Sequence, residues 1–404
     1  MANDCKSAAA DEAARVQFIA GMEAWLRQRG YATRSVSVYT TCATRFLLWA
    51  ARTGRPPRSL GYEDAVAYGA ELVSSGRWQD RGRRSCIDYT AARRFVAYLR
   101  QCGLGPQDAP PTEADKVLQG FQWWVRVHRG LMETTIAAYS RRIERLLDAV
   151  GADPGAYTAE GLRAFVLEEA ARRGPCTAEA LVTAVRVFLR YLVAIGACPA
   201  TFRHAIPSVA KWRLARLPRH LGVSEIERVL QTPDLSTDLG VRDHAVLLLL
   251  ARLGLRGADI ASMVLDDLEW SEGRVRVAGK GRRDDRLPLL QDVGDAILRY
   301  LVAARPRSLS SQVFLLTRAP YSAIRPHVVS QIARRALRAA QVDAAPLGAR
   351  VFRHSLATSM LRKGVPLQSI AGILRHRNID TTLHYAKVDI ESLRRVAAPW
   401  PEVA

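Results

Sequence analysis

Apolar residues recur at three- and four-residue intervals through the first half of the chain. The pattern is clear in residues 18–26, 36–49 and 95–99, where it predicts amphipathic helices. Strict alternation of apolar and polar residues, which would indicate strands, is scarce before about residue 205. We therefore expect the first half of the chain to be helical.

This helical half contains an internal repeat. The residues that match at fixed offsets are Arg29, Gly30 and Tyr39 with Arg129, Gly130 and Tyr139, and Phe95, Tyr98, Leu99 and Gly103 with Phe188, Tyr191, Leu192 and Gly196. The repeat predicts two similar helical modules in tandem, residues 1–105 and 112–200. Chance similarity between Arg-rich amphipathic helices is the alternative. The stretch 103–111, with three prolines, separates the modules.

A basic connector follows at residues 201–220. It contains Pro207 and Pro218, and its charged residues include Lys211, Arg213, Arg216 and Arg219. A flexible linker is one interpretation of such a segment, and a segment that lies along a phosphate backbone is the other. We expect these four cations to contact DNA if the second interpretation holds.

A third domain is expected over residues 221–404. Ser224 and Glu227 suggest a capping box before a helix at 226–230, and the apolar run 245–253 predicts a buried helix that ends at Gly254. Alternation in 273–280 and 286–290 predicts a β-hairpin, with a short third strand at 313–316. The predicted fold class is thus mainly α, with a small antiparallel sheet in the C-terminal domain.

Charge narrows the class of partner. The 404 residues suffice for two or three domains, and 59 Lys and Arg against 39 Asp and Glu give a net charge of +20. Such an excess favours a polyanionic partner, nucleic acid before an anionic membrane surface. Neither a membrane-spanning apolar run nor a signal peptide is found. We therefore expect a cytoplasmic protein without a membrane partner.

The six cysteines form no Cys-x-x-Cys pair and all lie in the first half of the chain. This distribution predicts reduced, mostly buried thiols, without a disulfide framework or a zinc site.

Five segments of the C-terminal domain carry candidate chemistry. In chain order they are Leu253-Gly-Leu-Arg256 with Asp259, Gly279-Lys280-Gly281, Phe352-Arg353-His354-Ser355-Leu356-Ala357-Thr358, Leu374-Arg375-His376, and His384-Tyr385. In order and spacing they resemble the tyrosine recombinase (phage integrase) family, over about residues 220–390. The family counterparts include a Gly-Leu-Arg turn, an Arg-His-Ser/Thr helix and a Leu-Gly-His segment, followed by the nucleophilic tyrosine.

The resemblance implies strand transfer through Tyr385 without a metal or ATP. A tyrosine hydroxyl can attack phosphorus and hold the 3′ end as a phosphotyrosine ester, which conserves bond energy for rejoining. The charge that develops on the non-bridging oxygens needs fixed donors, and the forked guanidinium groups of Arg256 and Arg353 suit that task.

The remaining implied roles concern protons and orientation. Lys280, on the predicted hairpin, is suited to protonate the departing 5′ oxygen. His376 is expected to hydrogen-bond a phosphoryl oxygen or the tyrosine oxygen, and Asp259 to act indirectly by orienting Arg256 or nearby backbone. Arg282 and Arg283, in the hairpin turn, are expected to contact DNA.

One position departs from the family pattern. Three residues before Arg353 the family usually carries His, whereas this chain has Arg350. Arginine donates hydrogen bonds but is a poor base. Either Arg350 acts electrostatically, or His376 or solvent accepts the tyrosine proton, or the enzyme is slow.

The resemblance also implies assembly and context. It implies helical (SAM-like) modules that bind double-stranded DNA, an integrase-type catalytic domain of the DNA-breaking-rejoining fold, and a homotetramer on paired sites. Helper recombinases, a nucleoid location, and DNA integration or transposition of a mobile element are further expectations. The alternatives are a type IB topoisomerase, a catalytically impaired architectural DNA-binding protein and an RNA-binding protein.

Overall fold

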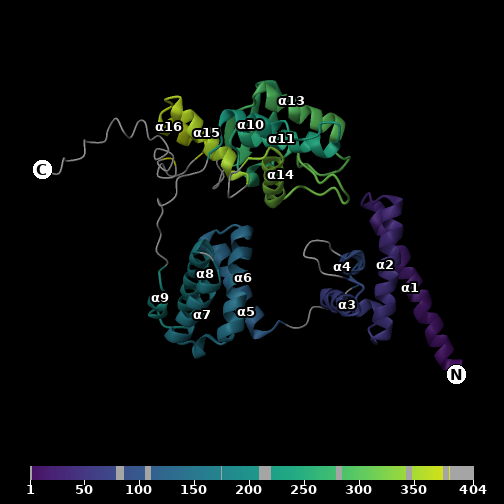
Figure 1. Cartoon of the computed structure of the whole chain (residues 1–404). Coiled ribbons are helices and arrows are strands. Elements are labelled where there is room, and N and C mark those ends of the chain that lie inside the picture. Colours follow the sequence, from purple (N-terminus) through teal and green to yellow (C-terminus); the bar gives the residue numbers. More distant parts are fainter. Residues whose placement is uncertain are drawn as a thin grey trace. The chain divides into compact units, whose positions relative to one another are not determined.

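The structure is a computed structural model of the chain and describes residues 2–78, 86–104, 111–173, 175–208, 220–278, 284–342, 348–375 and 382. The described residues are mostly helical and include one three-stranded antiparallel sheet (Figure 1), which confirms the predicted fold class. The chain divides into two compact units: residues 104–213 form one, and residues 1–103 and 214–404 belong to the other.

Among its described residues, the N-terminal segment contains four α-helices and one short 3-10 helix. They are α1 (Ala2–Gln28), α2 (Thr33–Arg52), the short 3-10 helix η1 (Pro57–Ser59), α3 (Tyr62–Ser74) and α4 (Ile87–Gln101). Helix α2 packs against α1, α3 and α4, and Phe46 and Phe95 lie fully buried between them. The periodic stretches predicted to be helical therefore lie in helices.

Residues 104–213 repeat this order of elements. The helices are α5 (Glu113–Arg129), α6 (Glu133–Val150), the 3-10 helix η2 (Pro154–Ala156), α7 (Ala159–Arg172) and α8 (Pro175–Ala194), with the short α9 (Phe202–Ala205) at the end. Helix α9 falls within 201–220, so the first residues of the predicted basic connector are helical. A single helical turn is favoured there because Ile206 packs into the core of this unit.

The repeat extends to particular packing contacts. In each segment a glycine of the first helix faces a buried tyrosine of the last helix: a Cβ atom at Gly21 would overlap the hydroxyl of Tyr98, and one at Gly120 would overlap that of Tyr191. Gly30 ends the first helix of one segment with a positive φ of 76°. The two segments thus share one arrangement of helices, as the sequence repeat predicts.

The C-terminal domain surrounds helix α11. Its helices and strands are α10 (Val223–Leu230), α11 (Asp238–Arg252), α12 (Gly257–Ser262), η3 (Leu265–Asp267), β1 (Leu268–Glu269), η4 (Trp270–Glu272), β2 (Arg274–Ala278), β3 (Asp284–Pro288), α13 (Gln291–Arg299), the π-helix η5 (Tyr300–Ala304), α14 (Pro326–Ala339), α15 (Arg350–Arg362) and α16 (Leu367–Ile373). The apolar run 245–250 is buried along α11, which packs against α13, α14 and α15.

The sheet follows the sequence order β1-β2-β3, and all pairs are antiparallel. Val275 pairs with Leu287, and both side chains are buried, as are those of Val277 and Leu268. The alternation of apolar and polar residues therefore places one face of the hairpin against the core. The predicted hairpin is confirmed.

The predicted third strand at 313–316 is wrong, because the third strand of the sheet is β1. Within the described chain, 313–316 forms only an isolated bridge, between Leu315 and Ala323. Side chains and separate backbone groups together satisfy its backbone. Arg305 donates to the carbonyl of Val313, Arg242 donates to that of Leu315, and the Tyr300 hydroxyl accepts from the Leu315 N–H. The N–H groups of Val313 and Leu316 donate to the carbonyls of Met263 and Ser322. An apolar run can thus be buried without a neighbouring strand.

Two smaller predictions also need correction. The helix after the connector begins at Val223, and the carboxylate of Glu225 accepts from the N–H of Gly222, so the capping box at Ser224 is wrong. Cys42 is buried, and burial raises its pKa to about 11, whereas Cys102 is exposed, so the prediction of mostly buried thiols does not hold for Cys102.

Candidate active site

The turn between α11 and α12 carries Arg256 and is tightly packed. Gly254 has a positive φ of 59°, and a Cβ atom there would lie 2.9 Å from Leu356 Cδ2 and 3.1 Å from Leu374 Cδ2. Only glycine adopts this conformation without strain and also leaves room for the two leucines. The sequence Gly-Leu-Arg therefore presses the backbone of the turn against α15 and the end of α16.

Arg256 lies at the start of α12, with about half of its side chain exposed (47%). Its Nη2 atom donates to the carbonyl of Arg375 at 3.3 Å. Its backbone N–H donates to Asp259 Oδ2 at 3.1 Å, while Nη1 lies 4.0 Å from the same oxygen. Asp259 therefore caps the helix from which Arg256 projects, and part of the guanidinium still faces solvent.

Arg353 lies in the first turn of α15 and is 8% exposed. Its Nη1 atom donates to the carbonyl of Gly254 at 2.7 Å, and Nη2 donates to that of Leu374. The carbonyls of Leu374 and Arg375, which accept from Arg353 and Arg256, belong to residues whose Cα atoms are about 3.8 Å apart. Both guanidinium groups therefore donate to the same short stretch of backbone, at the end of α16.

Arg350 is the first residue of α15, one turn before Arg353, and its side chain is exposed. The positive end of the helix dipole disfavours a cation at this position and favours an anion. A bound phosphate would therefore relieve an unfavourable arrangement at the start of α15.

Ser355 joins the start of the C-terminal domain to the same helix. Its buried hydroxyl accepts from the N–H of Leu221 at 2.7 Å and donates to the carbonyl of Val351 at 2.7 Å. The polypeptide that follows the basic connector is therefore attached to α15 two residues after Arg353. Ser355 of the Arg353-His354-Ser355 motif therefore has a structural role.

The other predicted site residues lie outside the described residues. These are Lys280, His376 and Tyr385, together with Lys211, Arg213, Arg216, Arg219, Arg282 and Arg283. The pairing of Ala278 with Asp284 makes residues 279–283 the hairpin connection in the chain, and this connection includes Lys280. His376 follows Arg375 directly in the sequence.

Sequence reasoning missed Arg375 as a site residue. Its guanidinium forms an ion pair with Asp259, and the two side chains are 6% and 12% exposed. The sequence did contain a signal for it, because Leu374-Arg375-His376 has arginine where the family's Leu-Gly-His segment has glycine.

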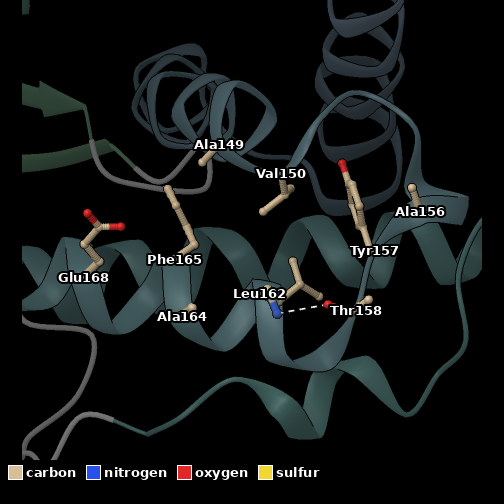
Figure 2. Close-up of a pocket in the computed structure, with 10 residues that line it drawn as sticks. Ala149, Val150, Ala156, Tyr157, Thr158, Leu162, Ala164, Phe165 and Glu168 are labelled. Carbon is tan, nitrogen blue, oxygen red and sulfur yellow. Dashed lines mark hydrogen bonds between the residues drawn. The ribbon is translucent and has the colours of Figure 1, made fainter.

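A pocket of about 330 Å³ lies in the unit of residues 104–213, between α7 and the end of α6 (Figure 2). Tyr157, Leu162 and Phe165 are among its lining residues, and its Thr158 hydroxyl accepts from the N–H of Gly161 at 3.0 Å. That hydrogen bond is a helix cap, and the lining is mostly apolar.

The described residues contain neither a membrane-spanning helix nor a metal-binding cluster. Within those ranges, no helix combines the length and apolar character needed to cross a membrane. Among the same residues, no group of three or more His, Cys, Asp or Glu side chains is arranged to hold a metal ion.

Comparison with known proteins identifies the family. Residues 219–392 match the model of the phage integrase family. A protein of Sinorhizobium fredii named as integrase/recombinase y4rA is 36% identical over 387 residues, which cover 93% of this chain and 92% of that protein. This chain belongs to the phage integrase family. It is a tyrosine-type site-specific DNA recombinase.

Solved structures of phage integrase family members share the fold. XerH site-specific recombinase, crystallised with its difH substrate, aligns with a TM-score of 0.56 at 15% identity, over 84% of this chain and 97% of that one. A lambda integrase tetramer bound to a Holliday junction aligns with a TM-score of 0.52 at 15% identity, over 80% of this chain and 91% of that one. The alternative of a type IB topoisomerase is not favoured.

Proposed function

We propose that this recombinase cleaves duplex DNA through Tyr385, assisted by Arg256, Arg353, Lys280 and His376. The tyrosine oxygen attacks the scissile phosphorus and forms a 3′-phosphotyrosine ester, while the bond from phosphorus to the 5′ oxygen breaks. Lys280 gives a proton to the departing 5′ oxygen, so that a free 5′ hydroxyl results. The reverse steps, with the 5′ hydroxyl of another strand as nucleophile, complete the exchange.

The observation that carries this proposal is the convergence of two guanidinium groups. Arg353 and Arg256 donate to consecutive carbonyls, and Arg256 keeps about half of its surface exposed to solvent. Two forked cations that donate to one stretch of backbone suit the two non-bridging oxygens of a phosphodiester. Loss of one such donor typically raises the barrier by about 3 kcal/mol.

The proton of Tyr385 needs an acceptor, and the chain has arginine where the family usually has histidine. The exposed Arg350 lies at the start of α15, where an anion is favoured. We infer that Arg350 acts by charge, lowering the pKa of the tyrosine, and that His376 or solvent takes the proton. Arg350→His is then expected to keep or raise the cleavage rate, and a thousand-fold drop would show that Arg350 itself is catalytic.

DNA recognition is assigned to both helical modules and to the connector. The proposed domains are 1–105 and 112–200, which bind DNA, 201–220, which lies along the phosphate backbone, and 221–404, which is catalytic. The support is the repeated helix arrangement, the net charge of +20, and the binding of DNA by XerH and lambda integrase. Arg282 and Arg283 are assigned to contacts beside the scissile phosphate.

Assembly and context extend the proposal. We infer four protomers on two DNA sites, because the related lambda integrase forms a tetramer on a Holliday junction. A cytoplasmic, nucleoid-associated recombinase of a mobile element, with helper recombinases, fits the similarity to integrase/recombinase y4rA.

A suicide duplex tests the catalytic assignment. The duplex carries a nick next to the scissile phosphate, so that cleavage releases a short fragment and traps the covalent complex on a denaturing gel. The parent is expected to form the adduct, and Tyr385→Phe to form none while binding the duplex equally. Equal adduct from both proteins would remove Tyr385 from the mechanism.

A further inference from the structure

A buried arginine closes the turn after α16. Arg375 has a positive φ of 53°, a conformation that residues other than glycine adopt rarely, and its side chain is 6% exposed. A long charged side chain is costly in such a place unless it is paired and hydrogen-bonded. Its partners therefore indicate what it does.

The guanidinium of Arg375 connects three elements of the domain. It forms an ion pair with Asp259 in the first turn of α12, and its Nη1 atom donates to the carbonyl of Val277 on β2 at 3.4 Å. Asp259 also accepts from the backbone N–H of Arg256. The side chain of Arg375 thus ties the end of α16 both to the helix that begins at Arg256 and to the strand that leads to Lys280.

The backbone at the same place holds both proposed catalytic arginines. The carbonyl of Leu374 accepts from Arg353 Nη2, and the carbonyl of Arg375 accepts from Arg256 Nη2 at 3.3 Å. These two carbonyls lie on either side of the Arg375 Cα atom, so the backbone conformation at Arg375 decides where the two guanidinium groups lie relative to each other. The side chain of Arg375 anchors the backbone at that residue.

We propose that Arg375 is a positioning residue for strand cleavage: its buried pair with Asp259 fixes the backbone at Arg375, whose flanking carbonyls, those of Leu374 and Arg375, align Arg353 and Arg256 on the scissile phosphate. This inference rests on the proposed roles of those two arginines. Arg375 acts through them and does not itself contact DNA.

Arg375→Gly removes the side chain and keeps the backbone turn, because glycine adopts a positive φ readily. The full chain is assayed in single turnover on the nicked suicide duplex, with DNA affinity measured in parallel. A displacement of catalytic groups by about 1 Å can slow a reaction about 100-fold, and we expect a loss of that order in the cleavage rate. The affinity for DNA should stay at the parent value, because the residue is buried.

A second substrate distinguishes alignment of the arginines from a general structural loss. In it, a methylphosphonate replaces the scissile phosphate and removes the charge that the guanidinium groups neutralise. The deficit of Arg375→Gly is expected to shrink strongly on this substrate. An equal deficit on both substrates, or parent rates on the phosphate, overturns the inference.

Gln341→Gly is the matched control. Gln341 also has a φ of 53°, but it is exposed at the end of α14, so its replacement should leave cleavage unchanged. A comparable loss in this variant would show that glycine at a left-handed position slows cleavage by itself, and would overturn the assignment of Arg375.

The double variant Arg375→Gly/Asp259→Asn keeps the test decisive if the single variant does not fold, because it leaves no unpaired buried charge. Asparagine keeps an oxygen that can accept from the N–H of Arg256, so the double variant loses the same contact between residues 375 and 259, and its cleavage should be as slow as expected for Arg375→Gly. Parent-like cleavage by the double variant overturns the inference. Absence of adduct with the parent itself would overturn the proposed catalytic residues as well, so the two failures are distinguishable.

Discussion

Gly254→Ala should destabilise the C-terminal domain by an amount that follows from the geometry of the turn. An L-residue in the left-handed region costs about 1–2 kcal/mol. The new methyl group would also lie 2.9 Å from Leu356 Cδ2 and 3.1 Å from Leu374 Cδ2. Overpacking of this kind typically costs about 1–3 kcal/mol. The expected loss in the free energy of unfolding is therefore about 2–5 kcal/mol.

Gly273→Ala is the matched control for the conformational part of this cost. Gly273 has a φ of 60°, almost the same as the 59° of Gly254, but a Cβ atom there would have no neighbour within 4 Å. We expect it to lose only about 1–2 kcal/mol. The difference between the two variants isolates the overpacking.

Hydrogen exchange followed by mass spectrometry suits this measurement, because the full chain has several parts that need not unfold together. Peptides from residues 245–250 lie in the buried helix α11 and report the opening of its domain. The variant should also cleave more slowly, because the carbonyl of Gly254 accepts from Arg353. Equal losses of stability in Gly254→Ala and Gly273→Ala would refute the reasoning.

Three further variants test interactions in the same domain. Asp243→Ala should lower the free energy of unfolding by about 3–5 kcal/mol, because Arg242, 3% exposed, would lose the carboxylate that accepts from it. Ser355→Ala should cost about 1–3 kcal/mol, because the buried N–H of Leu221 loses its acceptor. Burial lowers the pKa of His244 below its ordinary value of 6.5, so the stability that depends on neutral His244 is present above that pH and is lost as pH falls. Between pH 7 and 5, His244→Gln should therefore lose less stability than the parent.

Each of these variants has a control. Glu272→Ala breaks an exposed pair with Arg274 and should cost less than about 1 kcal/mol, so an equal effect of Asp243→Ala would contradict its assignment. Ser359→Ala, at a less buried position of α15, should be nearly neutral beside Ser355→Ala. If His244→Gln and the parent lose stability equally on acidification, the burial of His244 does not govern that pH dependence.

Local patterns in the sequence were sufficient to predict several helices and the β-hairpin. Helical periodicity located α2 and α4, the apolar run located α11, and alternation located the β2–β3 hairpin, because each signal lies within one element. The order of the motifs also indicated the family before any contact was known.

Contacts between distant residues were beyond that reasoning. Arg375 and Asp259 are 116 positions apart, and nothing near either residue indicates their ion pair. The stretch 313–316 was predicted to be a strand because its composition cannot reveal that the side chains of Arg305 and Arg242 bind the carbonyls of Val313 and Leu315. The start of α10 was misplaced because Glu225 competes with Glu227 as a capping residue.

The hydrogen bond from Leu221 to Ser355 has a mechanical consequence. It fastens the end of the basic segment to α15 itself, two residues from Arg353, instead of to the rim of the domain. If the helical modules bind DNA as proposed, a pull along that segment would act on α15, the helix that contains Arg353.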